Sequence, residues 1–185
     1  MGALRWRPPQ PPASWTGVRA CTEYSVAAPQ KNPFGPSKFA QSEDCLYLNV
    51  LTPAKRVADR LPVMVWMHGG GYAFGTGKDP ACNLPGLPQH GVILVTVNMR
   101  LNLLGLLVHP LLSKESPNDV SGNYIFLDMI AALKWVQGNI AAFGGDPDNM
   151  TIFGESGGGA KVSNLMASPL ARGLFHRAIL ERGTG

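Results

Sequence analysis

The sequence predicts an α/β fold with a mostly parallel central sheet and helices on its faces. Residues 61–67 (LPVMVWM) and 92–97 (VILVTV) are almost continuously apolar, which is typical of strands buried on both faces of a parallel sheet. Segments of helical periodicity alternate with such runs, as they do in α/β proteins. With 185 residues, 45% hydrophobic and 15% charged, the chain has the composition of one globular domain.

The expected elements follow in order along the chain. Residues 1–41 are rich in proline and lack periodicity, so we expect an extended arm that lies over the sheet and helices of residues 42–185. Strands are expected at residues 45–51, 61–67, 92–97, 150–153 and 174–180. Apolar residues at helical spacing predict a helix within residues 119–140, a Gly-Gly-Asp-Pro turn follows at residues 144–147, and a second helix is expected at residues 158–166.

The last expected strand is followed only by residues 181–185. A parallel strand at the edge of a sheet needs a neighbour or a cover. We therefore expect residues 1–185 to be the N-terminal part of a single larger domain, incomplete at its C-terminal side.

The basic residues are dispersed rather than clustered. The net charge is +4, but Arg5, Arg7, Lys55, Arg56 and Arg60 have no interleaved aromatic residues. Single-strand binding would require such aromatics, so these charges indicate a solvated surface and no nucleic-acid partner.

Cysteine usage and hydropathy limit the cellular setting. Cys21, Cys45 and Cys82 allow at most one disulfide and include no C-x-x-C pair for zinc, which favours a reducing compartment. No apolar run approaches the length of a membrane span, and the first fifteen residues lack the apolar core of a signal peptide. The sequence therefore predicts no membrane span and a cytoplasmic location.

The strongest chemical signal is a turn around Ser156. Gly154-Glu155-Ser156-Gly157-Gly158 fits G-x-S-x-G, between an expected strand and an expected helix. A serine on such a sharp turn has strained backbone angles, and the neighbouring glycines avoid side-chain collisions. The turn predicts a nucleophilic hydroxyl at a helix N-terminus, where an oxyanion is favoured. The alternative is a glycine-rich turn that contains a serine by chance.

A second glycine-rich segment, His68-Gly69-Gly70-Gly71, directly follows the strand at residues 61–67. Acyl transfer places negative charge on the former carbonyl oxygen, and backbone N–H groups aimed at that oxygen stabilise it. In hydrolases of the HGGG type this loop supplies such donors, together with the residue after the nucleophile. The predicted donors are the N–H groups of Gly70, Gly71 and Gly157.

Taken together, these segments resemble the type-B carboxylesterase family, the esterase and cholinesterase branch of the α/β-hydrolases. The resemblance runs nearly end to end. It is carried by RWRPPQPP, SEDCLYLNV, HGGGYAFG, VNMRL, WVQGNI, FGGDP and TIFGES. It implies an α/β-hydrolase fold and hydrolysis of a small carboxylic ester through an acyl-serine intermediate, without metal or cofactor; it leaves the oligomeric state open.

The resemblance also implies roles for other residues. Glu43 and Arg100 are expected to pair beneath the site, while Asp128 and Asp146 are expected to support helix and turn geometry. Glu155, beside the nucleophile, is expected either to tune the local field or to be structural. Tyr72, Phe74 and residues 103–106 are candidates for lining part of the site.

Two departures from the family pattern stand out. The family usually has alanine after the serine, whereas this chain has Gly157; the donor is a backbone group, so little chemical change is expected. In family members that have a disulfide, the cysteine of SEDC is usually bonded to a cysteine in the N-terminal arm. In this chain Ala28 occupies the matching position in the arm. Cys45 is therefore expected to be unpaired.

A serine needs a base to accept its proton. In α/β-hydrolases the acid and then the histidine follow the serine, but here only His176 and then Glu181 follow Ser156. The triad acid and histidine are therefore expected outside these 185 residues.

The other histidines offer weaker alternatives. His68 is expected to order the glycine loop, with a role as base as the alternative. His90 and His109 lie in proline-containing loops and are expected at the surface, and His176 is expected to pack at the sheet edge.

Three functions remain open from the sequence alone. The leading one is a serine carboxylesterase with Ser156 as nucleophile. The second is an incompetent fragment or pseudoenzyme that lacks the acid and histidine. The third is a non-catalytic adhesion module, which the retained Ser156 and glycine loop argue against.

Overall fold

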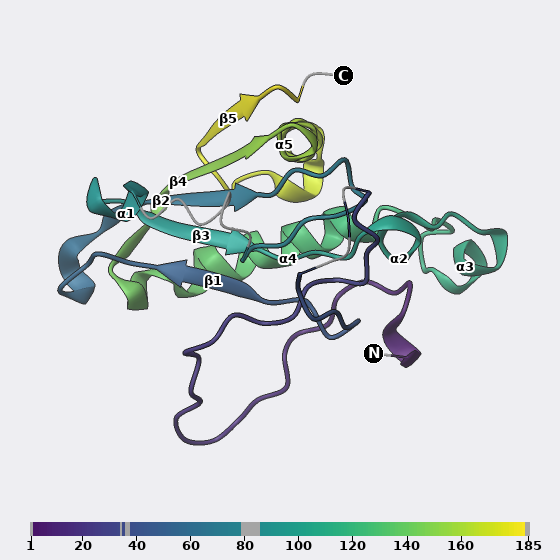
Figure 1. Ribbon diagram of the computed structural model, residues 1–185, viewed down its shortest axis with the longest axis horizontal. Coiled ribbons are helices and arrows are strands. Elements are labelled where there is room, and N and C mark those ends of the chain that lie inside the picture. The colour runs from purple at the N-terminus through teal and green to yellow at the C-terminus, as the bar shows by residue number, and fades with distance from the viewer. Residues whose placement is uncertain (1, 34, 36–37, 79–85, 184–185) are drawn as a thin grey trace.

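The structure is a computed structural model that describes residues 2–33, 35, 38–78 and 86–183. Its strands form one sheet in the order β1-β3-β2-β4-β5, which Figure 1 shows from β5 at the top to β1 at the bottom. The strands are β1 (Leu48–Leu51), β2 (Leu61–Met67), β3 (Ile93–Val97), β4 (Gly145–Glu155) and β5 (Arg177–Glu181). Only the β1–β3 pair is antiparallel. The predicted α/β fold with a mostly parallel sheet is therefore confirmed.

The two apolar runs occupy the centre of the sheet, as their composition predicts. β2 has the predicted bounds, and all five residues of β3 are buried. β4 instead begins five residues before the predicted position, because Gly145 already pairs with Leu61 before a shift in register leads to the Val63–Met150 pair. The expected Gly-Gly-Asp-Pro turn thus runs into the strand.

Helices of very different length connect these strands. The long ones are α4 (Tyr124–Asn139) and α5 (Gly157–Ala167), close to the predicted ranges. The short ones, which the sequence did not reveal, are α1 (Gly86–Gln89), α2 (Asn102–Leu106) and α3 (Pro110–Glu115). Single 3₁₀ turns are η1 (Gly2–Leu4), η2 (Val57–Asp59), η3 (Ile140–Phe143) and η4 (Pro169–Ala171). No helix within the described ranges is long and apolar enough to cross a membrane.

The main core lies between one face of the sheet and the two long helices. Alternate residues of the central strands point to this face, as the two-residue period of a strand requires. They pack with apolar residues of both helices: Val63, Val65, Met67, Ile93, Val95, Met150 and Ile152 meet Ile125, Met129, Leu133 and Val136 of α4 and Val162 and Leu165 of α5. On the other face, Trp66, Leu94 and Phe153 form a small separate cluster.

The N-terminal arm is attached through polar contacts rather than strands. Figure 1 shows it looping below β1, and its only β-contact among the described residues is the bridge between Ala27 and Gln41. Gln30 binds the backbone of Gly75 from both sides, donating to its oxygen over 2.9 Å and accepting from its nitrogen over 2.7 Å. The arm therefore holds the end of the segment that follows β2. The proposed division at residue 41 stays a prediction.

The expected Glu43–Arg100 pair is wrong. Arg100 binds Asp128 of α4 instead, with its Nε 2.9 Å and its Nη2 2.6 Å from the two carboxylate oxygens. Glu43 lies at the surface and pairs with Arg5. Because Asp128 is buried, it needs a charged partner more than the half-exposed Glu43 does.

The cysteines within the described residues are free thiols. Cys21 is exposed and Cys45 is buried, while Cys82 lies outside the described residues. Burial and, to a lesser extent, the nearby Asp128 carboxylate raise the pKa of the Cys45 thiol to about 12. The Cys45 thiol is therefore not ionised at neutral pH.

Candidate active site

Ser156 lies between the end of β4 and the start of α5. Its backbone angles are φ 57° and ψ −124°, a region that side-chain-bearing residues rarely adopt. Two backbone hydrogen bonds hold the turn: the Ser156 N–H donates to the Glu181 oxygen over 2.7 Å, and the Ser156 oxygen accepts from the Ala160 N–H over 3.1 Å. The neighbouring strand β5 and the first turn of α5 thus maintain the strained conformation.

The glycines around Ser156 are required by close backbone approach. A Cβ atom on Gly154 would lie 2.5 Å from the carbonyl carbon of Gly158 and 2.7 Å from the Met67 oxygen. A Cβ atom on Gly158 would overlap that same Met67 oxygen. The G-x-S-x-G spacing therefore lets the start of α5 pack directly on the end of β2.

The glycine loop lies against the serine turn. A Cβ atom on Gly69 would lie 3.7 Å from the Ser156 Cβ, and one on Gly157 would overlap the backbone nitrogen of Gly71. Positive φ angles at Gly70 and Gly71, 88° and 57°, turn the chain back on itself. The two segments that the sequence singled out are therefore brought together in space.

Three backbone N–H groups at this junction have no acceptor among the residues that the structure describes. No residue in the described part of the chain accepts from the N–H of Gly70, Gly71 or Gly157. Backbone donors that are left unpaired next to a strained residue are available to an anionic ligand.

His68 is buried behind this loop. Its side chain is 1% exposed, and Nδ1 donates to the Gly69 oxygen over 2.9 Å. Burial and, to a lesser extent, the nearby Lys161 ammonium lower the pKa of His68 to about 3. An imidazole with such a low pKa stays neutral at physiological pH and is a poor proton acceptor.

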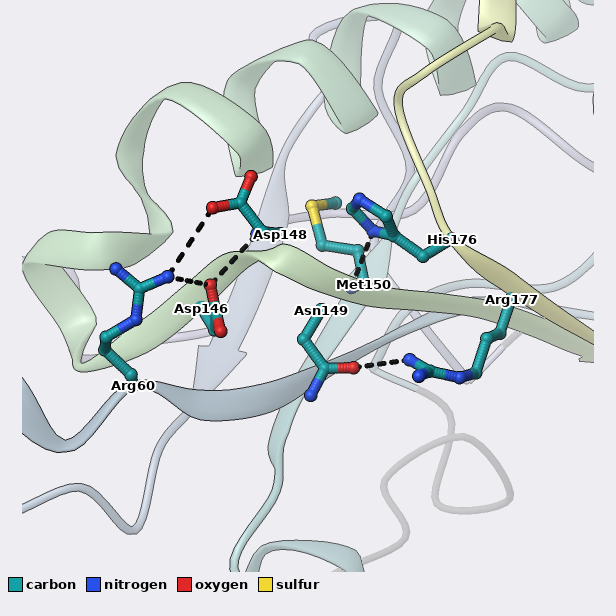
Figure 2. Close-up of polar contacts among 7 residues, drawn as sticks. All are labelled: Arg60, Asp146, Asp148, Asn149, Met150, His176 and Arg177. Atoms are coloured by element: carbon teal, nitrogen blue, oxygen red, sulfur yellow. Dashed lines mark hydrogen bonds and ion pairs between the residues drawn. The ribbon is translucent and has the colours of Figure 1, made fainter.

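The remaining histidines lie elsewhere. His90 is exposed just after α1, and His109 caps α3 by accepting from the Leu111 N–H over 3.2 Å. His176 accepts from the Met150 N–H over 3.1 Å, as Figure 2 shows. Because Met150 precedes Ser156 by six residues of extended chain, roughly 20 Å separate the two. None of these three is placed to accept the Ser156 proton.

The other candidates occupy the surroundings of the turn. Glu155 is half-buried and pairs in register with Glu181 of β5. The Tyr72 hydroxyl accepts from the Asn164 amide over 3.2 Å, which ties the segment after the glycine loop to α5. Leu103 is largely exposed, and its carbonyl oxygen accepts from the Trp6 indole over 2.8 Å.

Asp146, far from this site, has the expected role in turn geometry. It accepts from the Asp148 N–H over 3.0 Å and pairs with Arg60, as Figure 2 shows.

Sequence reasoning missed one residue of this region, Lys161 on α5. Its side chain is fully buried, and its Nζ donates to the oxygens of His68 and Gly69 over 2.7 and 3.3 Å. The available signal was its spacing: Lys161 is three residues after Gly158 and four before Leu165, on the buried side of the helix.

A mostly parallel sheet with a strained serine between a central strand and a helix defines the α/β-hydrolase class. A model of the carboxylesterase family matches residues 1–185, and the chain belongs to this family. It is 48% identical over 183 residues to the fumonisin B1 esterase of Sphingopyxis macrogoltabida and 45% identical over 188 residues to the para-nitrobenzyl esterase of Bacillus subtilis.

These alignments cover 98% and 99% of this chain but 34% and 37% of the two relatives. The chain thus spans about a third of the length of its relatives. Solved structures agree with this relationship. A PNB esterase aligns with a TM-score of 0.87 at 45% identity, covering 98% of this chain and 37% of its own. A carboxylesterase of Geobacillus stearothermophilus aligns with a TM-score of 0.87 at 46% identity, covering 96% and 36%.

Proposed function

We propose that this chain is the nucleophile-bearing portion of a serine carboxylesterase. In this proposal the Ser156 hydroxyl attacks the carbonyl carbon of an ester and forms an acyl-serine, which water then hydrolyses. The observation that carries the proposal is the group of unpaired N–H donors of Gly70, Gly71 and Gly157 beside the strained Ser156.

The donors suit the charge that the reaction creates. Attack on the carbonyl carbon turns its oxygen into an oxyanion, and backbone N–H groups fixed in advance stabilise that charge without reorganising. They also lie at the N-terminus of α5, where the helix dipole favours negative charge.

The proton acceptor is proposed to lie outside these 185 residues. His68 is buried with a strongly lowered pKa, and His90, His109 and His176 lie away from the serine turn. The family match covers a third of its relatives' length, so the acid and histidine are assigned to the part of the family that this chain does not match.

The substrate class is a carboxylic ester. The relatives are named for substrates as different as fumonisin B1 and para-nitrobenzyl esters. Their shared feature is the ester group, and the donors described here would contact that group rather than the rest of the substrate.

A fluorophosphonate probe tests the proposal, because it reacts covalently with an activated serine. The complete gene product should be labelled at Ser156 and should hydrolyse p-nitrophenyl acetate. Ser156→Ala should abolish labelling and lower kcat by about 10⁴-fold or more. Ser163→Ala, an exposed serine on the same helix, is the matched control and should behave as wild type. Absent labelling of the complete wild-type protein would refute the proposal.

The alternative of an incompetent fragment concerns the 185-residue chain by itself. The positions of the four histidines favour it, since none of them is placed as a base for Ser156. Incubation of this chain with a short-chain aryl ester decides: turnover well above that of its Ser156→Ala variant would exclude the alternative.

A further inference from the structure

A buried lysine lies directly behind the proposed oxyanion donors. Lys161 is on the second turn of α5, and its side chain is fully buried. Its Nζ donates to the carbonyl oxygens of His68 and Gly69 and lies 5.3 Å from the centre of the Tyr72 ring. Burying a charged ammonium is unfavourable unless hydrogen bonds and other polar contacts compensate, so these contacts define a built site for the charge.

Peptide geometry links these carbonyls to the donors. The carbonyl of Gly69 and the N–H of Gly70 belong to one planar trans peptide, in which oxygen and hydrogen point in opposite directions. The Gly69 oxygen accepts from the Lys161 ammonium and from His68 Nδ1, so the Gly70 N–H points away from these two donors. The shorter contact, 2.7 Å to the His68 oxygen, fixes the preceding peptide in the same way.

The glycine loop needs such an anchor because its sequence does not restrain it. Three consecutive glycines leave the backbone of residues 69–71 with more conformational freedom than any other residue type would. Positive charge at the carbonyl end of a peptide also polarises its N–H, which strengthens that group as a donor.

We propose that Lys161 is a positioning residue for catalysis: its ammonium holds the His68 and Gly69 carbonyls so that the Gly70 N–H faces the developing oxyanion. The inference rests on the proposed esterase function. In this proposal Lys161 touches neither substrate nor Ser156 and acts on the reaction through the glycine loop.

The test separates oxyanion stabilisation from general structural support. An oxoester and the matching thionoester are compared in the complete enzyme, because sulfur is a weaker hydrogen-bond acceptor than oxygen and gains less from the donors. Lys161→Met keeps the length of the side chain and removes the charge, Lys161→Gln keeps hydrogen-bond donors without the charge, and Lys161→Arg keeps the charge. Active-site titration of Ser156 normalises each rate to correctly folded enzyme.

Lys161→Met should lower kcat for the oxoester by about 10- to 100-fold, with KM within about threefold of wild type. The thionoester should lose far less, so the ratio of the two kcat values falls by at least about fivefold. Lys161→Gln should give an intermediate ratio, and Lys161→Arg should restore the ratio to within about threefold. If Lys161→Met does not fold, the Gln and Arg variants alone give the same comparison.

One result would overturn the inference: a ratio of the two kcat values that does not change in the Met and Gln variants. Equal losses for both substrates after titration would give such an unchanged ratio and would mean a purely structural lysine. A complete wild-type enzyme whose Ser156 cannot be titrated would instead refute the proposed function itself.

Discussion

The two ends of β4 are built in opposite ways. At its amino end, polar side chains meet and satisfy one another: Arg60 pairs with Asp146, Asn149 accepts from Arg177 over 2.6 Å, and His176 binds the backbone of Met150, all shown in Figure 2. At its carboxyl end, glycines replace residues with side chains, and backbone groups therefore approach one another closely around Ser156.

We therefore infer that the amino end of β4 mainly stabilises the fold, whereas its carboxyl end forms the candidate site. Contacts that are complete within the protein stabilise the fold and leave nothing for a ligand. Unpaired N–H groups and a strained serine are unfavourable in the free protein and, in the proposed esterase function, contribute only when a substrate is bound. Open parallel sheets bind ligands at the carboxyl ends of their strands, as this arrangement requires.

The largest expected effect comes from adding one methyl group at the carboxyl end. Gly158→Ala should destabilise the protein by at least about 3 kcal/mol, because the new Cβ would overlap the Met67 backbone oxygen, which cannot rotate away. Urea unfolding followed by circular dichroism measures the change.

The matched control for this variant is Gly138→Ala on α4. A Cβ atom there meets nothing within 4 Å, so the variant should be as stable as wild type or up to about 1 kcal/mol more stable. Equal stability of the two variants would contradict the claim that the carboxyl end of β4 needs glycine for its close backbone packing.

The second expected effect is a loss of stability at acidic pH that comes from His68. Since the folded protein holds the pKa of His68 near 3, the unfolded chain binds a proton to this imidazole at a higher pH than the folded protein does. Stability should therefore fall as pH drops from about 6.5 toward 3, by up to about 1.4 kcal/mol per pH unit from this group. His68→Phe should lose this part of the slope.

Other groups also titrate in that range, so the difference between variants is the relevant quantity. His90→Gln changes an exposed histidine and should keep the wild-type slope. In the wild-type protein, NMR should show the His68 ring neutral at pH 5; a ring that protonates near pH 6.5 would rule out the buried, neutral imidazole described here.

The sequence predicted the parts of this molecule that depend on local pattern. The central strands were predicted well because two apolar runs leave few alternatives, and β2 has the expected bounds. The serine turn and the glycine loop could be predicted because their glycines occur at fixed spacing, and that spacing is required where backbone segments approach too closely for a side chain. The start of β4 was missed because Asp146, Pro147 and Asp148 resemble a turn, whereas the residues on either side of them, Gly145 and Met150, both pair with β2.

Tertiary partners of charged residues could not be predicted in this way. Arg100 binds Asp128 from a helix 28 positions further along the chain, and no local pattern distinguishes Asp128 from Glu43 as its partner. Lys161 escaped notice for a related reason. A lysine in a helix is normally solvated, and only the close approach of the glycine loop gives this one buried acceptors.

The smallest expected effect tests the amino end of β4. His176→Ala should destabilise the protein by about 1 to 2 kcal/mol, because the buried Met150 N–H loses its acceptor. His176→Asn should retain most of the stability, since the side-chain oxygen of asparagine can take the place of Nδ1. Thermal unfolding of both variants measures the difference.

Neither substitution should change kcat of the complete enzyme after titration of Ser156, because His176 lies at the opposite end of β4 from the serine. A fall in kcat of tenfold or more in His176→Ala, with partial recovery in His176→Asn, would mean that this end of the strand also serves catalysis. The separation of stability from function along β4 would then be wrong. A loss of kcat that His176→Asn does not recover would instead return His176 as a candidate base, because an asparagine amide cannot accept the serine proton.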